Sequence, residues 1–144
     1  MREIKFRAWC KNKNEWETDR IAIQPDGSIL HMSTTKNMPC MVKAETHDIQ
    51  MFTGLLDKKG KEIYEGDVVS ATPKPNACGV VSSVNGQSCF ERVVIWLDND
   101  ARFSWQLLDG TINASGYTLC KNNEDLFEVI GNIHDNPDFL KGKE

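Results

Sequence analysis

The stretch TGLLDKKGKEIYEGDVV, residues 53–69, contains the residue types of a phosphate-binding loop. Such a loop requires G-x-x-x-x-G-K-[ST], because backbone N–H groups converge on the phosphate and the hydroxyl holds magnesium. Here five residues separate Gly54 from Gly60, and the following lysine precedes Glu62 instead of Ser or Thr. The flanking sequence is typical of strands, so no long helix begins there to add its dipole. We therefore interpret residues 57–61 as a polar hairpin turn with a positive φ at its glycine.

Carboxylates offer a second kind of chemistry. Three of them surround the glycine of the EGD turn: Glu62, Glu65 and Asp67. Acid/base catalysis needs carboxylates whose pKa values are separated by burial, whereas we expect carboxylates beside a glycine turn to be solvated. Residues 98–100, Asp-Asn-Asp, resemble the start of a calcium loop, but the required glycine and bidentate glutamate do not follow. We predict neither a catalytic carboxylate pair nor a calcium site.

Histidines and cysteines, the common zinc ligands, are widely separated in the sequence. The histidines are His31, His47 and His134, and the cysteines are Cys10, Cys40, Cys78, Cys89 and Cys120. There is no C-x-x-C pair and no H-x-x-x-H, so only the fold could bring a cysteine and a histidine together. There is also no G-x-S-x-G motif. We predict no metal, no cofactor, no catalytic residue and no enzymatic activity, and we assign no binding residues.

Charge argues against general nucleic-acid binding. The 144 residues carry a formal net charge of −4, with a sequence pI of about 5.4, whereas nucleic-acid binders present a positive surface. Lys58, Lys59 and Lys61 cluster, but we interpret them as a solvated turn. A nucleic-acid site would need them to share a face with other cations, such as Lys36, Lys43, Arg92 or Arg102.

The N-terminal sequence predicts neither secretion nor a membrane anchor. It lacks a long apolar segment and a small-residue cleavage pattern. The longest strongly apolar run is residues 93–97, far short of the roughly 20 residues that span a membrane. An odd number of scattered cysteines is typical of reduced thiols. We therefore expect a cytoplasmic protein.

The elements that would position these residues are strands. Alternation or β-branched content predicts strands within residues 3–10, 15–24, 29–32, 47–52, 63–71, 91–98, 102–110 and 126–134. A turn is expected at residues 25–28, and residues 33–46, which contain Pro39, are interpreted as a long connection. Pro137 follows Asn136 at the start of a single helical turn. The predicted class is mainly β.

Tryptophans are the strongest candidates for the core or for an interface. Trp96 and Trp105 lie on the predicted central strand pair and are expected in the core. Trp9 falls on the strand face opposite Ile4 and Phe6. It either packs against the second part of the chain or forms an exposed aromatic anchor of the kind that interfaces favour.

Three segments together resemble one known family. The chain opens with IKFRAW, carries TGLLDKKGKEIYEGDVV in its middle, and closes with FEVIGNIHDNPDFL. These segments are similar to the start, the central signature and the ending of the YopX family, small proteins found largely in phages and prophages. Two positions depart from the family pattern: Met51 replaces a usual glutamine, and Cys10 stands where aspartate is common.

The resemblance implies a fold and a biological context but no established activity. It implies a mostly β protein whose second part is a small Src-homology-3-like β-barrel. Together with the strands predicted above, we expect an N-terminal β-hairpin segment over residues 1–50, including the connection, packed with this barrel over residues 51–144, which ends in a short helical turn. We expect a non-enzymatic phage or prophage accessory protein that binds or assembles by self-association or with a protein partner. The alternative is a nucleic-acid-binding small barrel.

Overall fold

The computed structural model describes residues 3–17, 21–26, 28–32, 39–42, 46–71, 90–99, 101–108 and 127–141. These residues form strands and one short 3-10 helix, and no α-helix occurs among them, which confirms the mainly β prediction. The chain divides into two compact units. The N-terminal unit is Lys5–Met51, and the C-terminal unit is Phe52–Glu144 together with Met1–Ile4. Across the part of the chain that the structure describes, no helix combines the length and the apolar character needed to cross a membrane.

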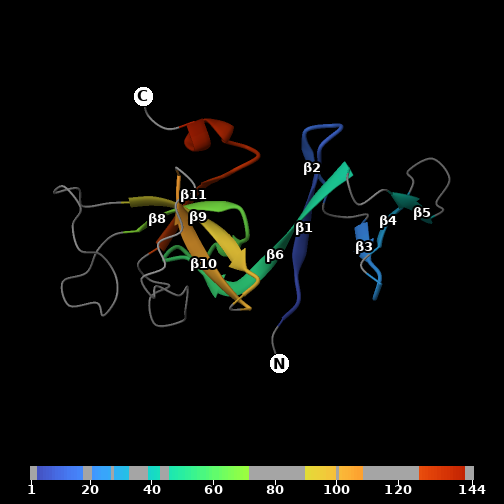
Figure 1. The fold of residues 1–144 in the computed structure, drawn as a ribbon, viewed down its shortest axis with the longest axis horizontal. Helices are drawn as coiled ribbons and strands as arrows, with labels where there is room; N and C mark the ends of the chain where they lie inside the picture. Colours follow the sequence, from blue (N-terminus) through green and yellow to red (C-terminus); the bar gives the residue numbers. More distant parts are fainter. Residues whose placement is uncertain are drawn as a thin grey trace. The chain divides into compact units, whose positions relative to one another are not determined.

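Antiparallel pairing builds the first sheet of the N-terminal unit. Its strands are β1 (Phe6–Cys10), β2 (Glu15–Glu17) and residues 47–51 of β6 (His47–Leu56). Strand β1 lies in the middle, and the register pairs Trp9 with Trp16 on β2 and Cys10 with His47 on β6. This register brings the ends of three strands together (Figure 1).

The face of β1 that carries Trp9 is covered. Trp9 is 8% exposed, and its ring meets that of Trp16 edge-on at 5.0 Å. The guanidinium of Arg7 lies 4.5 Å from the centre of the Trp16 ring, where a cation is attracted to the π face. The interpretation of Trp9 as an exposed anchor is therefore wrong. Ile4, expected on the buried face, precedes the strand and is 80% exposed.

A second sheet of the N-terminal unit contains the predicted hairpin. Its strands, in spatial order, are β3 (Ile21–Ile23), β4 (Ile29–Met32) and β5 (Pro39–Val42). The turn between β3 and β4 is closed by Gln24 N–H donating to Ser28 O at 2.9 Å. Strand β5 falls inside the segment predicted to be a connection, so that prediction is wrong for these residues. Proline is tolerated there because β5 is an edge strand among the described strands, paired with β4, and Pro39 is its first residue.

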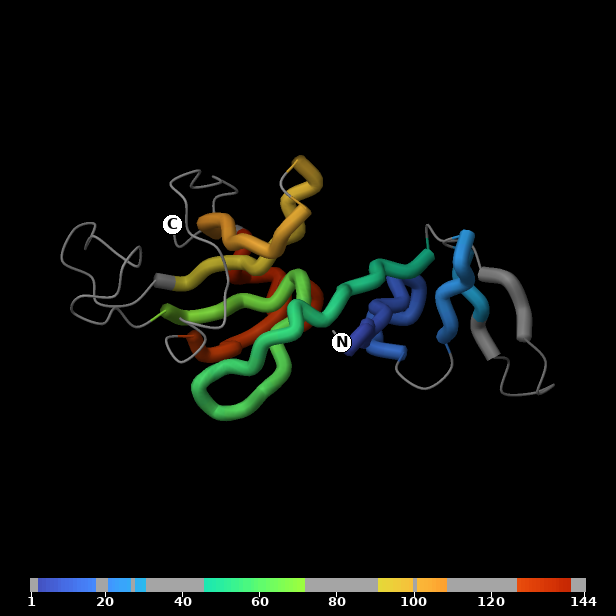
Figure 2. Tube along the Cα trace, turned by 90° about the horizontal axis from the view of Figure 1, so that it is seen from below, coloured from blue at the N-terminus to red at the C-terminus, as the bar shows by residue number. Residues whose placement is uncertain are grey.

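The C-terminal unit is built around one curled sheet. In spatial order its strands are β10 (Arg102–Leu107), β9 (Phe90–Leu97), β8 (Asp67–Ala71) and β11 (Phe127–Asn132). Residues 52–56 of β6 pair with β7 (Glu62–Tyr64), and the 3-10 helix η3 (Pro137–Lys141) follows β11 (Figures 1 and 2). The predicted antiparallel pairing of β9 with β10 and the predicted helical turn are both confirmed.

Aromatic and β-branched side chains form the core of this unit. Phe127 is 0% exposed, and its ring lies 4.9 Å from that of Trp105. Val69 and Val94, also fully buried, pack in the same sheet. Trp105 is therefore a core residue as predicted. The same prediction is wrong for Trp96, which is 37% exposed.

Gly131 on β11 allows η3 to pack closely against the strand. A Cβ at this position would lie 2.5 Å from Asn136 Oδ1 and 2.8 Å from Phe139 Cε2. We expect Gly131→Ala to lower the free energy of unfolding by about 1–3 kcal/mol, because overpacking forces neighbouring groups to move. Urea unfolding of the two proteins measures this difference. Gly54→Ala cannot serve as the control, because Gly54 has a φ of +87° and any side chain there would be strained. The control is Leu140→Ala at an exposed position, which should change the free energy of unfolding by no more than about 0.5 kcal/mol.

Candidate functional site

The glycines of the signature stretch bend the backbone, as the sequence predicted. Gly54, Gly60 and Gly66 have φ angles of 87°, 82° and 75°, in the left-handed region that glycine adopts without a steric cost. At Gly54 the register between β6 and β7 shifts between Phe52 and Leu56. Gly60 N–H closes the predicted turn by donating to Asp57 O at 2.9 Å. The stretch thus contains parts of three strands, β6, β7 and β8, joined by two turns, and it has none of the helix that a phosphate loop precedes.

Asp57 organises the first of these turns. One carboxylate oxygen, Oδ1, accepts hydrogen bonds from the N–H groups of Lys59 at 2.8 Å and Lys61 at 2.9 Å. The other oxygen, Oδ2, accepts the N–H of Val129 on β11 at 3.0 Å. Burial by itself would raise the pKa of Asp57, but these three N–H donors and the Lys61 charge lower it below its ordinary value. The carboxylate therefore joins the turn to the last strand of the sheet.

The lysines at this turn pair with a neighbouring carboxylate. Lys58 Nζ lies 2.6 Å from Glu128 Oε2, and Lys59 Nζ contacts Glu128 Oε1. Hydrogen bonds from Lys58 and Lys59, helped by their charges, lower the pKa of Glu128 to about 2. Much of the local positive charge is thereby compensated. Arg92 and Arg102 lie on β9 and β10, whereas Lys36 and Lys43 lie outside the described residues.

The carboxylates of the EGD turn also have structural partners. Asp67 is 1% exposed, so the expectation that it is solvated is wrong. Its Oδ2 accepts the N–H of Tyr64 at 2.8 Å, and its Oδ1 accepts the side-chain N–H of Asn132 at 3.1 Å. Glu62 accepts the hydroxyl of Tyr64 at 2.7 Å. Donors from β7 and β11 therefore hold the buried carboxylate.

The remaining sequence candidates are dispersed. Asp98 and Asn99 are exposed residues of the turn between β9 and β10, and Asp100 lies outside the described residues. His134 lies in the turn after β11, where its N–H donates to Asn132 Oδ1 at 3.0 Å. The backbone of His31 is in β4, and its side chain is not among those described.

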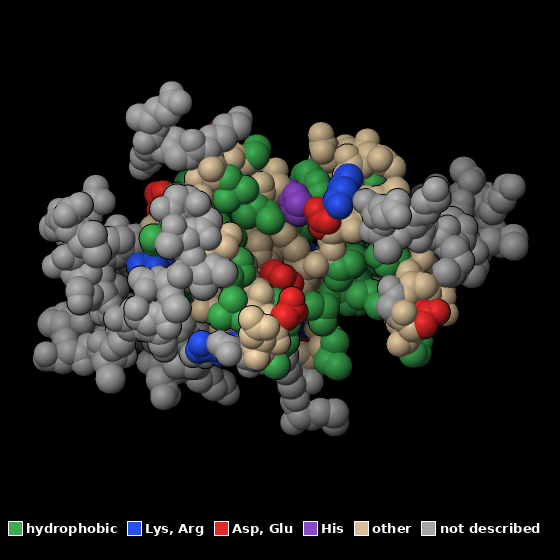
Figure 3. Space-filling view, in the orientation of Figure 1, with side chains coloured by type: hydrophobic (Ala, Val, Ile, Leu, Met, Phe, Trp, Pro, Cys, Tyr) green, Lys and Arg blue, Asp and Glu red, His purple; other side chains and the backbone are tan. Residues whose placement is uncertain are grey.

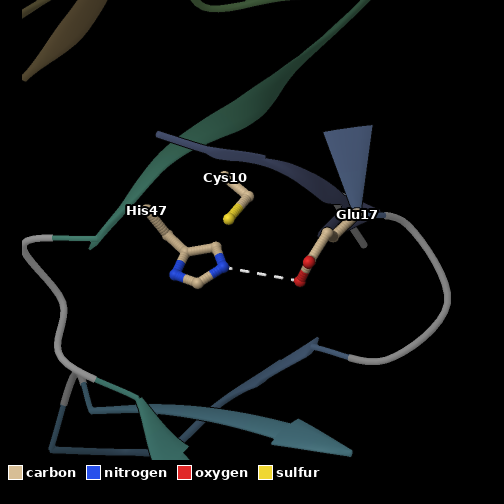
Figure 4. A group of neighbouring side chains, drawn as sticks. All are labelled: Cys10, Glu17 and His47. Atoms are coloured by element: carbon tan, nitrogen blue, oxygen red, sulfur yellow. Dashed lines mark ion pairs between the residues drawn. The ribbon is translucent and has the colours of Figure 1, made fainter. Parts of the chain in front are cut away.

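The N-terminal unit contains a cluster that sequence spacing did not reveal. Cys10, Glu17 and His47 offer a thiol sulfur, a carboxylate oxygen and a ring nitrogen that all lie within 4.8 Å of one another. The side chains point toward one another from the ends of β1 and β2 and the start of β6 (Figure 4). Cys10 is a buried free thiol, and the side chains of Glu17 and His47 are 9% and 5% exposed. No sequence spacing marks the cluster, because the cross-strand register that pairs Cys10 with His47 brings the donors together.

Neighbouring side chains hold the cluster in place. Thr46 Oγ1 lies 2.9 Å from His47 Nδ1, so a hydrogen bond anchors this edge of the ring. Lys13 contacts Glu17 Oε1, and this hydrogen bond raises the pKa of the lysine. The other carboxylate oxygen, Oε2, lies 3.4 Å from His47 Nε2. A thiol, an imidazole and a carboxylate are the side chains that bind zinc in proteins.

Comparisons with known proteins place the chain in a family. A family described as YopX protein matches residues 5–141. The crystal structure of protein EF1440 from Enterococcus faecalis is similar, with a TM-score of 0.60 and 24% sequence identity. The similarity covers 97% of this chain and 99% of that chain and concerns the fold. Comparison with curated proteins gave no match. The family match confirms the resemblance noted in the sequence, and the chain belongs to the YopX family.

Proposed function

We propose that the protein is a non-enzymatic phage or prophage accessory protein whose C-terminal unit binds a second copy of the chain. The phage context, and with it the cytoplasm of a host cell, rests on the resemblance of the three sequence segments. In this proposal the C-terminal unit is a small barrel of the Src-homology-3-like kind. The curled sheet of β10, β9, β8 and β11, with its tight turns, supports that assignment.

Trp96 is the observation that carries the proposal. Its side chain is 37% exposed, although its ring is held edge-on against Phe103 at a centroid distance of 4.9 Å. A large aromatic group that is already ordered loses little conformational freedom when a partner covers it. Tryptophan is also enriched among the few interface residues that contribute most of the binding energy. Trp96 therefore has the properties of an interface anchor.

The roles of the signature carboxylates support a non-enzymatic protein. Asp57 and Asp67 accept hydrogen bonds from backbone and amide N–H groups inside the fold. General acid/base catalysis requires a carboxylate within reach of the substrate proton. These two carboxylates are directed instead at the chain's own donors, so their geometry favours a structural role.

The alternative of nucleic-acid binding has less support. Phosphate contacts require cations that are free to displace counterions, whereas Lys58 and Lys59 are paired with Glu128. On the face drawn in Figure 3, the described lysine and arginine side chains form separate groups, one of which lies beside acidic and histidine side chains. They form no continuous basic surface on that face.

Self-association is tested with Trp96→Ala. We expect the wild-type protein to dimerise at micromolar concentration in sedimentation velocity. The substitution should weaken the dimer at least about 30-fold, because removing an interface anchor typically costs about 2 kcal/mol or more.

Leu140→Ala is the matched control, because Leu140 is a similarly exposed apolar residue, 43% exposed, on η3. It should change the dimer dissociation constant less than about threefold. Circular dichroism establishes that both variants are folded. The proposal is contradicted if the wild-type protein remains monomeric over the whole concentration range. It is also contradicted if Trp96→Ala leaves the dimer dissociation constant unchanged.

A further inference from the structure

We propose that Cys10, Glu17 and His47 form a zinc-binding site in the N-terminal unit. Their three donor atoms lie within 4.8 Å of one another (Figure 4). His47 Nε2 and Glu17 Oε2 are 3.4 Å apart. Two ligands bound tetrahedrally to zinc at about 2.0–2.1 Å are separated by roughly 3.3 Å. The distance between imidazole and carboxylate therefore matches an edge of a zinc tetrahedron.

The buried nitrogen of His47 is the second observation that points to a ligand. His47 Nε2 is inaccessible to solvent, and within the part of the chain that the structure describes it has no hydrogen-bond partner. Its 3.4 Å separation from Glu17 Oε2 exceeds the usual 2.7–3.2 Å of an N–H···O hydrogen bond. A buried polar atom of this kind requires an explanation, and a metal ion supplies one.

The surroundings of the histidine suit metal binding. Nδ1 lies 2.9 Å from Thr46 Oγ1. In the tautomer that donates Nδ1–H to this hydroxyl, the lone pair of Nε2 is directed into the cluster. A metal-bound histidine usually donates its other ring N–H to a neighbouring acceptor, which fixes the orientation of the ring. Thr46 occupies that position here.

The charges and donor types select zinc. The Glu17 carboxylate is already paired with Lys13, so a deprotonated Cys10 would add the buried negative charge that a divalent cation compensates. Lys13 contacts Oε1 of Glu17, while Oε2 lies on the side of His47. The thiolate favours zinc over magnesium or calcium, which prefer oxygen ligands. Three protein ligands leave a fourth position for water.

A zinc ion bound at this site would join three strands. The ligands come from the last residue of β1, the last residue of β2 and the first residue of β6. Zinc that binds the folded unit and not the unfolded chain would stabilise this end of the sheet. At free zinc about 100-fold above the dissociation constant, the unfolding equilibrium constant should fall about 100-fold. The site lies in the unit that the proposed dimerisation does not use, so either proposal can fail alone.

Cobalt titration of the full chain provides the direct test. The reduced, chelator-treated protein should bind one Co²⁺ per chain with a thiolate-to-cobalt charge-transfer band, and Zn²⁺ should displace it. A variant with serine at Cys40, Cys78, Cys89 and Cys120 should retain the band, because Cys10 is then its only cysteine. Thermal unfolding with and without zinc should show a higher transition temperature in zinc.

Substitutions distinguish the proposed ligands from other groups. Cys10→Ser should abolish the charge-transfer band, and His47→Gln should weaken zinc binding more than about 100-fold. Thr46→Val should weaken it about 10–100-fold, the usual cost of losing a group that orients a ligand. His134→Gln makes the matched chemical change in the other unit and should leave zinc affinity unchanged.

The outcomes against the site are equally definite. A wild-type protein with neither a charge-transfer band nor a zinc-dependent transition temperature overturns the proposal. A band that persists in folded Cys10→Ser also overturns it, because another cysteine must then bind the metal. If Cys10→Ser does not fold, the variant whose only cysteine is Cys10 decides by the presence or loss of its band.

Discussion

Asp57→Ala is expected to lower the free energy of unfolding by about 3–4 kcal/mol. The substitution removes the acceptor of three backbone N–H groups, those of Lys59, Lys61 and Val129. The first two belong to exposed turn residues, whose N–H groups can regain water. The N–H of Val129 is buried, and an unsatisfied buried donor costs about 1–3 kcal/mol by itself. Urea unfolding at neutral pH measures the loss.

The same substitution should change the acid sensitivity of the fold. The folded-state pKa of Asp57 lies below its ordinary value of 3.8, so the folded protein binds fewer protons there than the unfolded chain. The stabilisation is complete above the unfolded pKa and is lost as the pH falls through the folded pKa. The difference between wild type and Asp57→Ala should therefore be constant near neutral pH and shrink below about pH 4.

Asp26→Ala is the matched control for Asp57. Asp26 also accepts a backbone N–H within a turn, that of Ser28 at 2.9 Å, but both residues are on the surface. Its removal should cost about 0.5–1 kcal/mol. If Asp57→Ala costs no more than Asp26→Ala, the three N–H contacts do not stabilise the fold as described.

Phe127→Ala is expected to cost about 3–5 kcal/mol, the usual loss when a fully buried aromatic ring leaves a cavity. Phe127 is 0% exposed, and its ring packs against that of Trp105 at 4.9 Å. The cavity should form where β11 and β10 face each other through their aromatic residues. Chemical denaturation followed by tryptophan fluorescence measures the loss.

Phe127→Leu tests whether the loss of stability in Phe127→Ala comes from the lost packing volume. Phe127→Leu keeps most of the apolar volume and should cost less than about 1.5 kcal/mol. A loss below about 1 kcal/mol in Phe127→Ala would mean that the ring is not part of a close-packed core.

Local chemistry accounts for the elements that the sequence predicted correctly. The β-branched and aromatic residues of β9 and β10, separated by an acidic turn, indicate a hairpin without further information. The glycines at 54, 60 and 66 mark bends because their φ values suit glycine. Strand β5 was missed because Pro39 argues against a central strand, and only the fold reveals that it begins an edge strand among the described strands.

The features that could not be predicted depend on contacts between different elements of the fold. Asp67 is buried because Asn132, 65 residues away, donates to it. Trp9 is covered because Trp16 and Arg7 close the second face of β1. The Cys10–Glu17–His47 cluster has no characteristic spacing, since cross-strand register and not periodicity brings the donors together. A pattern search along the chain contains no information on such pairings.

The hydrogen bond between Asp57 and Val129 has a consequence for the order of synthesis. It joins residues 72 positions apart, so the signature turn cannot complete its contacts until β11 has left the ribosome. During translation the nascent C-terminal unit lacks the strand that closes β8, and its apolar residues are available to chaperones. Closing so long a loop is also slow. The C-terminal unit should therefore reach its native state only after Val129 has left the ribosome, even if the turn at residues 57–61 forms earlier.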